Sequence, residues 1–162
     1  MTTKRAATKS APNPEAQLKG FIAKFSPAHQ VLIRAVRKAL QKRFPLAYEL
    51  VYDNYNFFVI GYGPTEKPSE AILSMAAGAN GVGLCFLHGA KLLDPKKILL
   101  GSGTQTRFIR LPTADVLARP EVEALIKAAV AQSKKPFRSS GQSELIIRSV
   151  SKKQRPRQTT KQ

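Results

Sequence analysis

The spacing of apolar residues changes at Pro45, and this change restricts the possible folds more than any other feature of the chain. Before Pro45 the apolar residues recur at the intervals typical of amphipathic helices. After it they alternate with a period near two, as in half-buried strands, and the helical spacing returns only beyond Pro120. The pattern therefore predicts two helices, several strands and a last helix, in that order.

Two helices are expected before Pro45. The second begins at Ser26-Pro27, because serine is a favourable N-cap and proline suits the first helical turn. It ends near Arg43 or Phe44, since the residue before a proline avoids helical geometry. The apolar stripe of the first helix comprises Leu18, Phe21, Ile22 and Phe25. The stripe of the second helix comprises Leu32, Ala35, Val36, Ala39 and Leu40.

The middle of the chain predicts an antiparallel sheet of about five strands. The expected strands are Tyr48–Tyr52, Asn56–Tyr62, Glu70–Ala76, Val82–His88 and Gln105–Leu111. Asn80-Gly81 supplies the positive φ angles that a tight hairpin between two of them needs. A last helix starts at Pro120 and packs on one face of the sheet. The resulting fold class is α+β, with helices segregated to one face.

Basic residues dominate the charge, and many of them lie near the two ends. The chain of 162 residues has 27 Lys and Arg against 10 Asp and Glu, a formal net charge of +17. Polar, basic composition predicts a disordered arm at 1–14 and a mostly disordered tail at 134–162, flanking an α+β domain at 15–133. One stretch of the tail, Ser143–Val150, is rich in strand-forming residues and is a candidate for docking on the domain.

Several classes of protein are excluded by what the sequence lacks. One cysteine permits neither a disulfide framework nor a multi-cysteine metal site. No apolar run approaches the roughly 20 residues of a membrane span, and Met1–Ala11 lacks the apolar centre of a secretory signal. We therefore expect a cytoplasmic protein. No catalytic motif is present, and Cys85 and His88 would point to opposite faces of a strand, so no enzyme is expected.

Two clusters could bind small ions. The first combines glycines, whose backbone N–H groups can turn toward an anion, with nearby cations; it comprises Lys96, Lys97, Gly101, Gly103, Arg107 and Arg110. Its alternative is a flexible loop with solvated arginines. The second is Glu49 with Asp53, which could share a hard cation if this stretch were helical or tightly turned. Its alternative is a Glu49 that pairs with a nearby Lys or Arg.

The chain also resembles a known family in three stretches. These are Phe44–Tyr52 with the following Gly61-Tyr62-Gly63, then Leu84–Pro95, and then Leu100–Leu111. Together they are similar to the YdhG-like domain of unknown function over Glu15–Ser133. The resemblance implies a small α+β fold, and one branch of the family is likened to frataxin and credited with iron delivery. It therefore implies iron as a candidate ligand, with Glu49 and Asp53 as the matching acidic positions.

This chain departs from that pattern at two points. Its second helix carries only basic residues outside, where frataxin-like proteins have an acidic ridge, and Gly103-Thr104 stands where the family has a glycine-lysine pair. The leading hypothesis is a non-enzymatic binding or carrier domain whose ligand is open. The alternative is a protein that binds nucleic-acid phosphates. Its expected contacts are Arg34, Arg37, Lys38, Lys42, Lys152, Lys153, Arg155 and Arg157.

Overall fold

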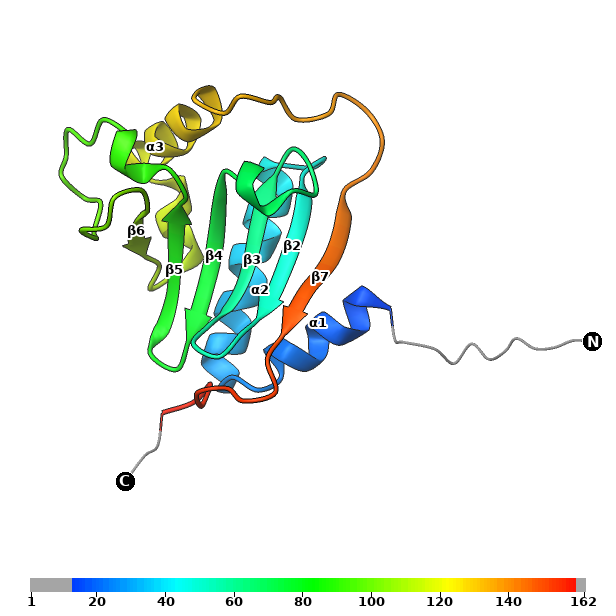
Figure 1. Cartoon of the computed structure of the whole chain (residues 1–162). Helices are drawn as coiled ribbons and strands as arrows, with labels where there is room; N and C mark the ends of the chain where they lie inside the picture. Colours follow the sequence, from blue (N-terminus) through cyan, green and yellow to red (C-terminus); the bar gives the residue numbers. More distant parts are fainter. Residues whose placement is uncertain (1–12, 160–162) are drawn as a thin grey trace, which may run out of the picture.

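The computed structural model describes residues 13–159, and the predicted arm therefore lies almost wholly outside the described residues (Figure 1). Within them the helices are α1 (Pro14–Ile22), α2 (Pro27–Arg43) and α3 (Pro120–Ala131). The strands are β2 (Tyr48–Asp53), β3 (Phe58–Gly63), β4 (Leu73–Gly78), β5 (Gly81–Phe86), β6 (Arg107–Arg110) and β7 (Glu144–Val150). Short 3-10 turns are η1 (Pro68–Glu70), η2 (Gly89–Lys91) and η3 (Ala114–Ala118).

The α+β class is confirmed, but the sheet is mixed and contains six strands within the described residues. Their order is β6-β5-β4-β3-β2-β7. Four neighbouring pairs are antiparallel, whereas β7 runs parallel to β2 at the far edge. After α3 the chain returns across one end of the sheet to reach this edge (Figure 1).

Capping residues and prolines determine where the helices begin and end. Ser26 is the N-cap of α2, and its hydroxyl accepts a hydrogen bond from the backbone N–H of His29. The helix ends at Arg43, as expected from Pro45. Its buried face is centred on Ile33, Val36 and Leu40, while Ala35 is exposed. The buried face is therefore rotated about the helix axis relative to the predicted stripe. Alanine contributes too little apolar area to decide which face is buried.

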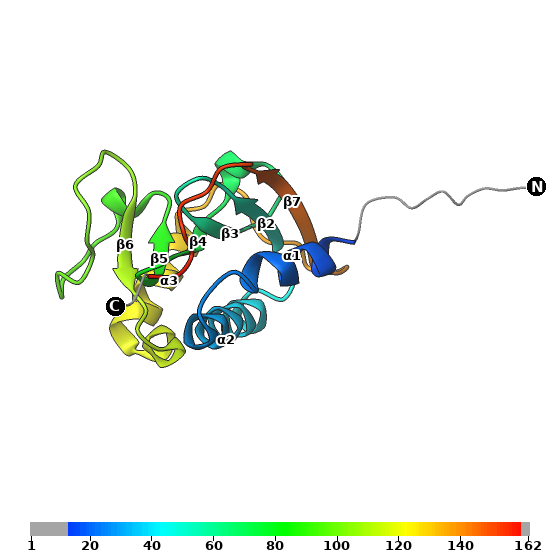
Figure 2. The same cartoon turned by 90° about the horizontal axis from the view of Figure 1, so that it is seen from below.

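One face of the sheet packs on the helices and forms the core. Seen from below, the three helices lie on the same side of the sheet (Figure 2). Alternate strand residues, among them Ile60, Met75 and Leu84, are completely buried against this layer. The Phe58 ring packs against both Phe21 and Phe25, with ring centroids 6.2 and 6.0 Å apart.

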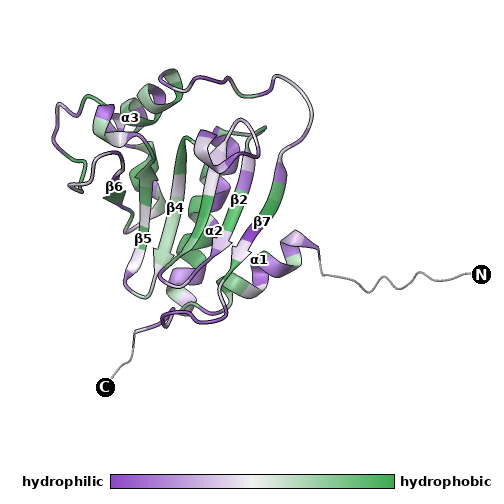
Figure 3. Cartoon of the chain, in the orientation of Figure 1, coloured by the Kyte–Doolittle hydropathy of each residue, from purple (hydrophilic) through white to green (hydrophobic). Residues whose placement is uncertain are grey.

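The expectation of a mostly disordered tail does not hold for residues 134–159. The predicted docking of Ser143–Val150 is confirmed, because β7 pairs with β2 along its whole length. The chain then crosses the end of the sheet, where Arg157 is only 4% exposed. This segment is strongly hydrophilic (Figure 3). Composition misled the prediction because polar residues can be ordered by specific ion pairs rather than by apolar burial.

Among the described residues, no α-helix covers the opposite face of the sheet (Figures 1 and 2). Its central strands present mostly small residues there, namely Gly61, Gly63, Ser74, Ala76, Gly78, Gly83 and Cys85. The η1 segment covers one end, because Ala71 lies so close to Gly63 that its Cα would be 2.8 Å from a Cβ at that glycine. We call the uncovered remainder of this surface, around Tyr52, Ala76, Gly83, Phe108 and Arg110, the open face.

Within the described residues, no helix has the length and apolar character needed to cross a membrane.

Candidate functional site

Glu49 points from β2 into the helix layer, where it is 3% exposed. Arg37 of α2 binds its carboxylate with two hydrogen bonds, from Nε to Oε2 at 3.0 Å and from Nη2 to Oε1 at 2.8 Å. The Tyr62 hydroxyl donates a further bond to Oε2 at 2.7 Å, and Gln41 donates one to Oε1 at 3.3 Å. Both carboxylate oxygens are therefore fully occupied by protein donors. The predicted alternative, in which Glu49 pairs with a nearby cation, is confirmed.

The same arginine also binds Glu15 of α1, with Nη2 2.7 Å from Oε2. Burial alone would lower the pKa of Arg37, but hydrogen bonds and charge from Glu49 and Glu15 outweigh it and raise that pKa. Burial, reinforced by the Glu49 charge, raises the pKa of Tyr62 well above its usual value. Arg37 is thus a structural cation that joins α1, α2 and β2, and its guanidinium is not free to bind phosphate.

Asp53, at the end of β2, has no exposed surface. Lys24 Nζ lies 2.6 Å from its Oδ2, and Arg157 Nη2 lies 2.8 Å from its Oδ1. Arg157 also donates to the carbonyls of Asn54 and Asn56, at 2.7 and 3.2 Å, and lies over the Phe25 ring. Asp53 therefore fixes the C-terminal segment to the end of the sheet.

The structure does not bring Glu49 and Asp53 together. The shared cation required a helix or a tight turn, whereas β2 is extended and separates residues four positions apart by about 13 Å. Three internal ion pairs occupy the two carboxylates. Among the described residues, no group of three or more His, Cys, Asp or Glu side chains could hold a metal ion. These residues do not fit iron.

The predicted anion cluster is dispersed as well. Arg107 Nη1 donates hydrogen bonds to the carbonyls of Gly103 and Thr106, at 2.6 and 2.9 Å. The guanidinium therefore stabilises its own loop. Arg107 and Arg110 project from opposite faces of β6, because they are three positions apart in an extended strand. Gly101 has a φ of +113° and holds the loop in a conformation that other residues avoid. Lys96 and Lys97 are exposed, as is Gly103.

The predicted phosphate contacts divide into two classes. Arg37 and Arg157 are used inside the fold, as described above. The exposed ones are Arg34, Lys38 and Lys42 on α2 and Lys152, Lys153 and Arg155 after β7. The positive outer face of α2 therefore remains, without Arg37.

A large positive charge stays unpaired on the described body. Four of the 27 basic residues, Lys4, Arg5, Lys9 and Lys161, lie outside it, while all 10 acidic residues lie within. The described body therefore has 23 basic and 10 acidic residues, a net charge of +13. The ion pairs between described residues occupy six of these cations, so 17 have no carboxylate within 4.0 Å. Such a surface attracts polyanions.

Aromatic side chains accompany several of these cations. Arg110 lies over Phe108, with 5.7 Å between the guanidinium carbon and the ring centroid. Arg155 lies over Tyr55 at 5.5 Å, and Arg138 lies over Tyr48 at 4.5 Å. The sequence analysis missed these pairs. In β2, Tyr48, Leu50 and Tyr52 alternate with Glu49, Val51 and Asp53, which are buried. This alternation could have indicated in the sequence that both tyrosines lie on the face away from the helices.

Two cavities formed by the described residues lie near the helices, and neither is lined by a Ser, Cys or His. One of about 190 Å³ lies beside the stacked rings of Phe44 and Phe137, and one of about 310 Å³ lies between α2 and η3. Cys85 faces away from both, toward the other side of the sheet. Burial raises the pKa of its thiol, although a hydrogen bond with Ser74 opposes this shift. A raised pKa makes Cys85 a weaker nucleophile at neutral pH.

Comparisons with known proteins find no matching family model, no matching curated protein and no matching solved structure.

Proposed function

We propose that this chain is a non-enzymatic binding module for polyanions, and that nucleic acid is its ligand class. The 17 described cations without a carboxylate partner are the single observation that carries the proposal. A surface of this kind binds phosphates by releasing condensed counterions. The resemblance to YdhG-like domains supports only the general class of a small binding domain. Iron is not part of this proposal.

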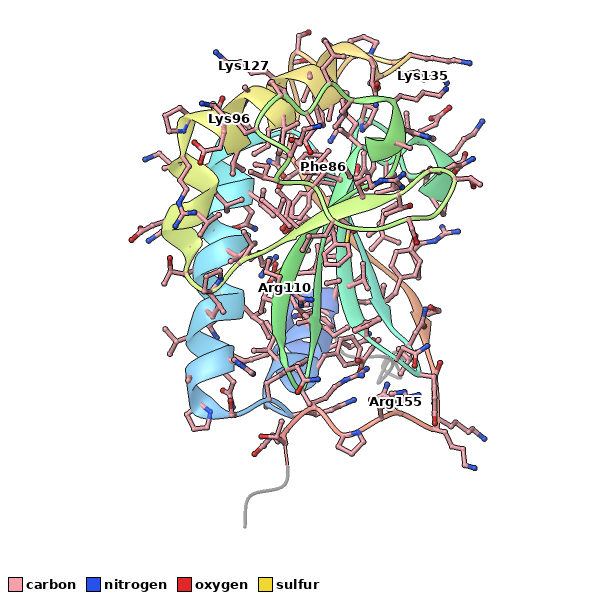
Figure 4. All side chains as sticks on the ribbon, turned by 90° about the vertical axis from the view of Figure 1, so that its left-hand side faces the viewer. Phe86, Lys96, Arg110, Lys127, Lys135 and Arg155 are labelled. Atoms are coloured by element: carbon pink, nitrogen blue, oxygen red, sulfur yellow. The ribbon has the colours of Figure 1, made fainter. Side chains whose placement is uncertain are left out.

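The distribution of the cations supports a long ligand rather than a compact one. Exposed cations without a carboxylate partner lie at both ends of the molecule, with Lys96 and Lys127 near one end and Arg155 near the other (Figure 4). The predicted small-anion loop does not gather its cations around one point, because Arg107 and Arg110 face opposite ways. A chain of phosphates can reach dispersed cations that one small anion cannot.

A salt titration tests this proposal. We expect the full chain to bind a fluorescein-labelled oligonucleotide, with fluorescence anisotropy giving the association constant. The logarithm of this constant should fall linearly with the logarithm of salt concentration, by about 0.7 per neutralised phosphate for single strands and about 0.9 for duplex. Heparin, a polyanion without bases, should compete. Absence of binding at about 50 mM salt would reject the proposal.

The arms and the body can be separated in the same assay. A chain lacking residues 1–12 removes Lys4, Arg5 and Lys9 and leaves every described element in place. We expect this chain to retain most of the affinity, because 23 of the 27 basic residues lie in the described body.

A further inference from the structure

The open face has a smooth centre. Its middle strands carry Ala76, Gly78 and Gly83, which are half-buried although no helix covers them. Small side chains here leave a shallow area between larger residues at its borders. A stripe of small residues is common in sheets and does not by itself make a binding site.

Accessible aromatic rings border this area. Phe57, in the turn between β2 and β3, is 52% exposed, and its ring lies 3.2 Å from where a Cβ of Gly78 would be. Phe108 of β6 lies beside Gly83. Tyr52 projects from β2 on the same face, and Tyr55 in the turn is 48% exposed. Rings that border a flat surface offer stacking partners for planar groups.

Arginines accompany these rings. Arg110 lies on the open face beside Phe108, and it is labelled on β6 in Figure 4. Arg148 is the extra residue at the bulge of β7, next to Ser149, which pairs with Tyr52. Burial raises the pKa of Tyr52, and the nearby charge of Arg148 partly opposes this shift. Arg155 lies over Tyr55. Among the described strand positions on this side of the sheet, Glu144 is the only acidic residue. It lies at the β7 edge and pairs with Arg138.

We propose that the open face binds single-stranded nucleic acid, with unpaired bases stacking on Phe57, Phe108 and Tyr52 and with the arginines binding the backbone. Aromatic rings interleaved with cations on a sheet are suited to single strands, because every base has a π-face that an aromatic ring can stack on. Bases in a duplex are already stacked on each other and do not reach such rings. This inference rests on the proposed function and specifies its ligand.

Charge complementarity indicates which kind of ligand the open face binds. A second protein that bound through apolar contact alone would gain nothing from Arg110, Arg148 and Arg155, which would lose hydration on its arrival. A nucleic-acid strand matches both the rings and the cations.

The test compares Phe57→Ala with Leu93→Ala. Both residues are exposed and apolar, but Leu93 is 86% exposed in the loop that follows η2 and does not belong to the turn or the strands of the open face. We expect Phe57→Ala to weaken binding of a labelled single-stranded oligonucleotide by about fivefold or more, as truncation of one stacking residue does. Leu93→Ala should leave it unchanged, and Phe57→Tyr should restore it. Thermal unfolding of each variant confirms that the fold is kept.

Heparin and a duplex of the same sequence separate the two proposals. We expect the duplex to compete less well than the single strand, and the affinity for heparin to be equal in wild type and Phe57→Ala. If Phe57→Ala binds the single strand as wild type does, or if the duplex competes equally, the stacking inference is overturned while polyanion binding stands. If neither heparin nor any oligonucleotide binds, the proposed function itself fails.

Discussion

Replacing Arg157 by alanine is expected to lower the free energy of unfolding by about 3 kcal/mol, measured by urea denaturation. The substitution leaves Asp53, which has no exposed surface, with one cation instead of two. The cost of an unpaired buried charge reaches about 5 kcal/mol, and the lower figure applies because Lys24 still contacts Oδ2. The carbonyls of Asn54 and Asn56 also lose their donor.

Lys153→Ala is the matched control for this change. Lys153 lies in the same segment but is exposed, so its removal should alter stability by no more than about 0.5 kcal/mol. The double variant Asp53→Asn, Arg157→Ala should be more stable than the sum of the two single effects predicts, because neither a buried carboxylate nor a buried guanidinium is left without its partner. Equal stability of Arg157→Ala and Lys153→Ala would contradict the anchoring of residues 151–159.

Arg37→Ala is expected to cost about 3–5 kcal/mol in the same measurement. It leaves the buried Glu49 carboxylate with two neutral donors, Tyr62 and Gln41, and no cation. Arg34→Ala is the control, since Arg34 is exposed on the same helix and should tolerate the change within about 0.5 kcal/mol. Similar losses for the two variants would show that Glu49 does not depend on Arg37.

The Arg37 effect should also depend on pH. The hydrogen bond from Arg37 lowers the pKa of Glu15 below its usual 4.5, more than burial raises it. A carboxyl with a depressed folded pKa contributes stability above its unfolded pKa, and this contribution is lost as pH falls through the folded pKa. Without Arg37 this contribution disappears. The difference in stability between wild type and Arg37→Ala should therefore be larger at pH 7 than at pH 3.

Local signals predicted the elements that local chemistry determines. Ser26-Pro27 and Pro45 placed the ends of α2 correctly. The hairpin between β4 and β5 was expected in the right place, but its turn residues are Ala79 and Asn80, and of the expected pair Gly81 alone has a positive φ, of +139°. Strand limits were less accurate. The strand expected at Glu70–Ala76 begins at Leu73, because Pro68–Glu70 form a 3-10 turn.

Contacts between distant residues could not be predicted in this way. Arg157 is 104 positions from Asp53, and nothing in the tail composition marks this arginine as buried among its exposed neighbours. The partners of Glu49 and Asp53 could not be identified for the same reason, since they come from α2, from residue 24 and from the C-terminal segment. The aromatic residues were visible in the sequence, but which side of the sheet the helices leave uncovered depends on the whole fold.

The most direct measurement is the mapping of amide chemical shifts by NMR as an unlabelled single-stranded oligonucleotide is added to the isotope-labelled chain. The account predicts that the largest changes occur at Tyr52, Phe57, Ala76, Gly83 and Phe108, with smaller ones at exposed cations elsewhere. Changes confined to the outer face of α2, at Arg34, Lys38 and Lys42, or an unchanged spectrum, would contradict it.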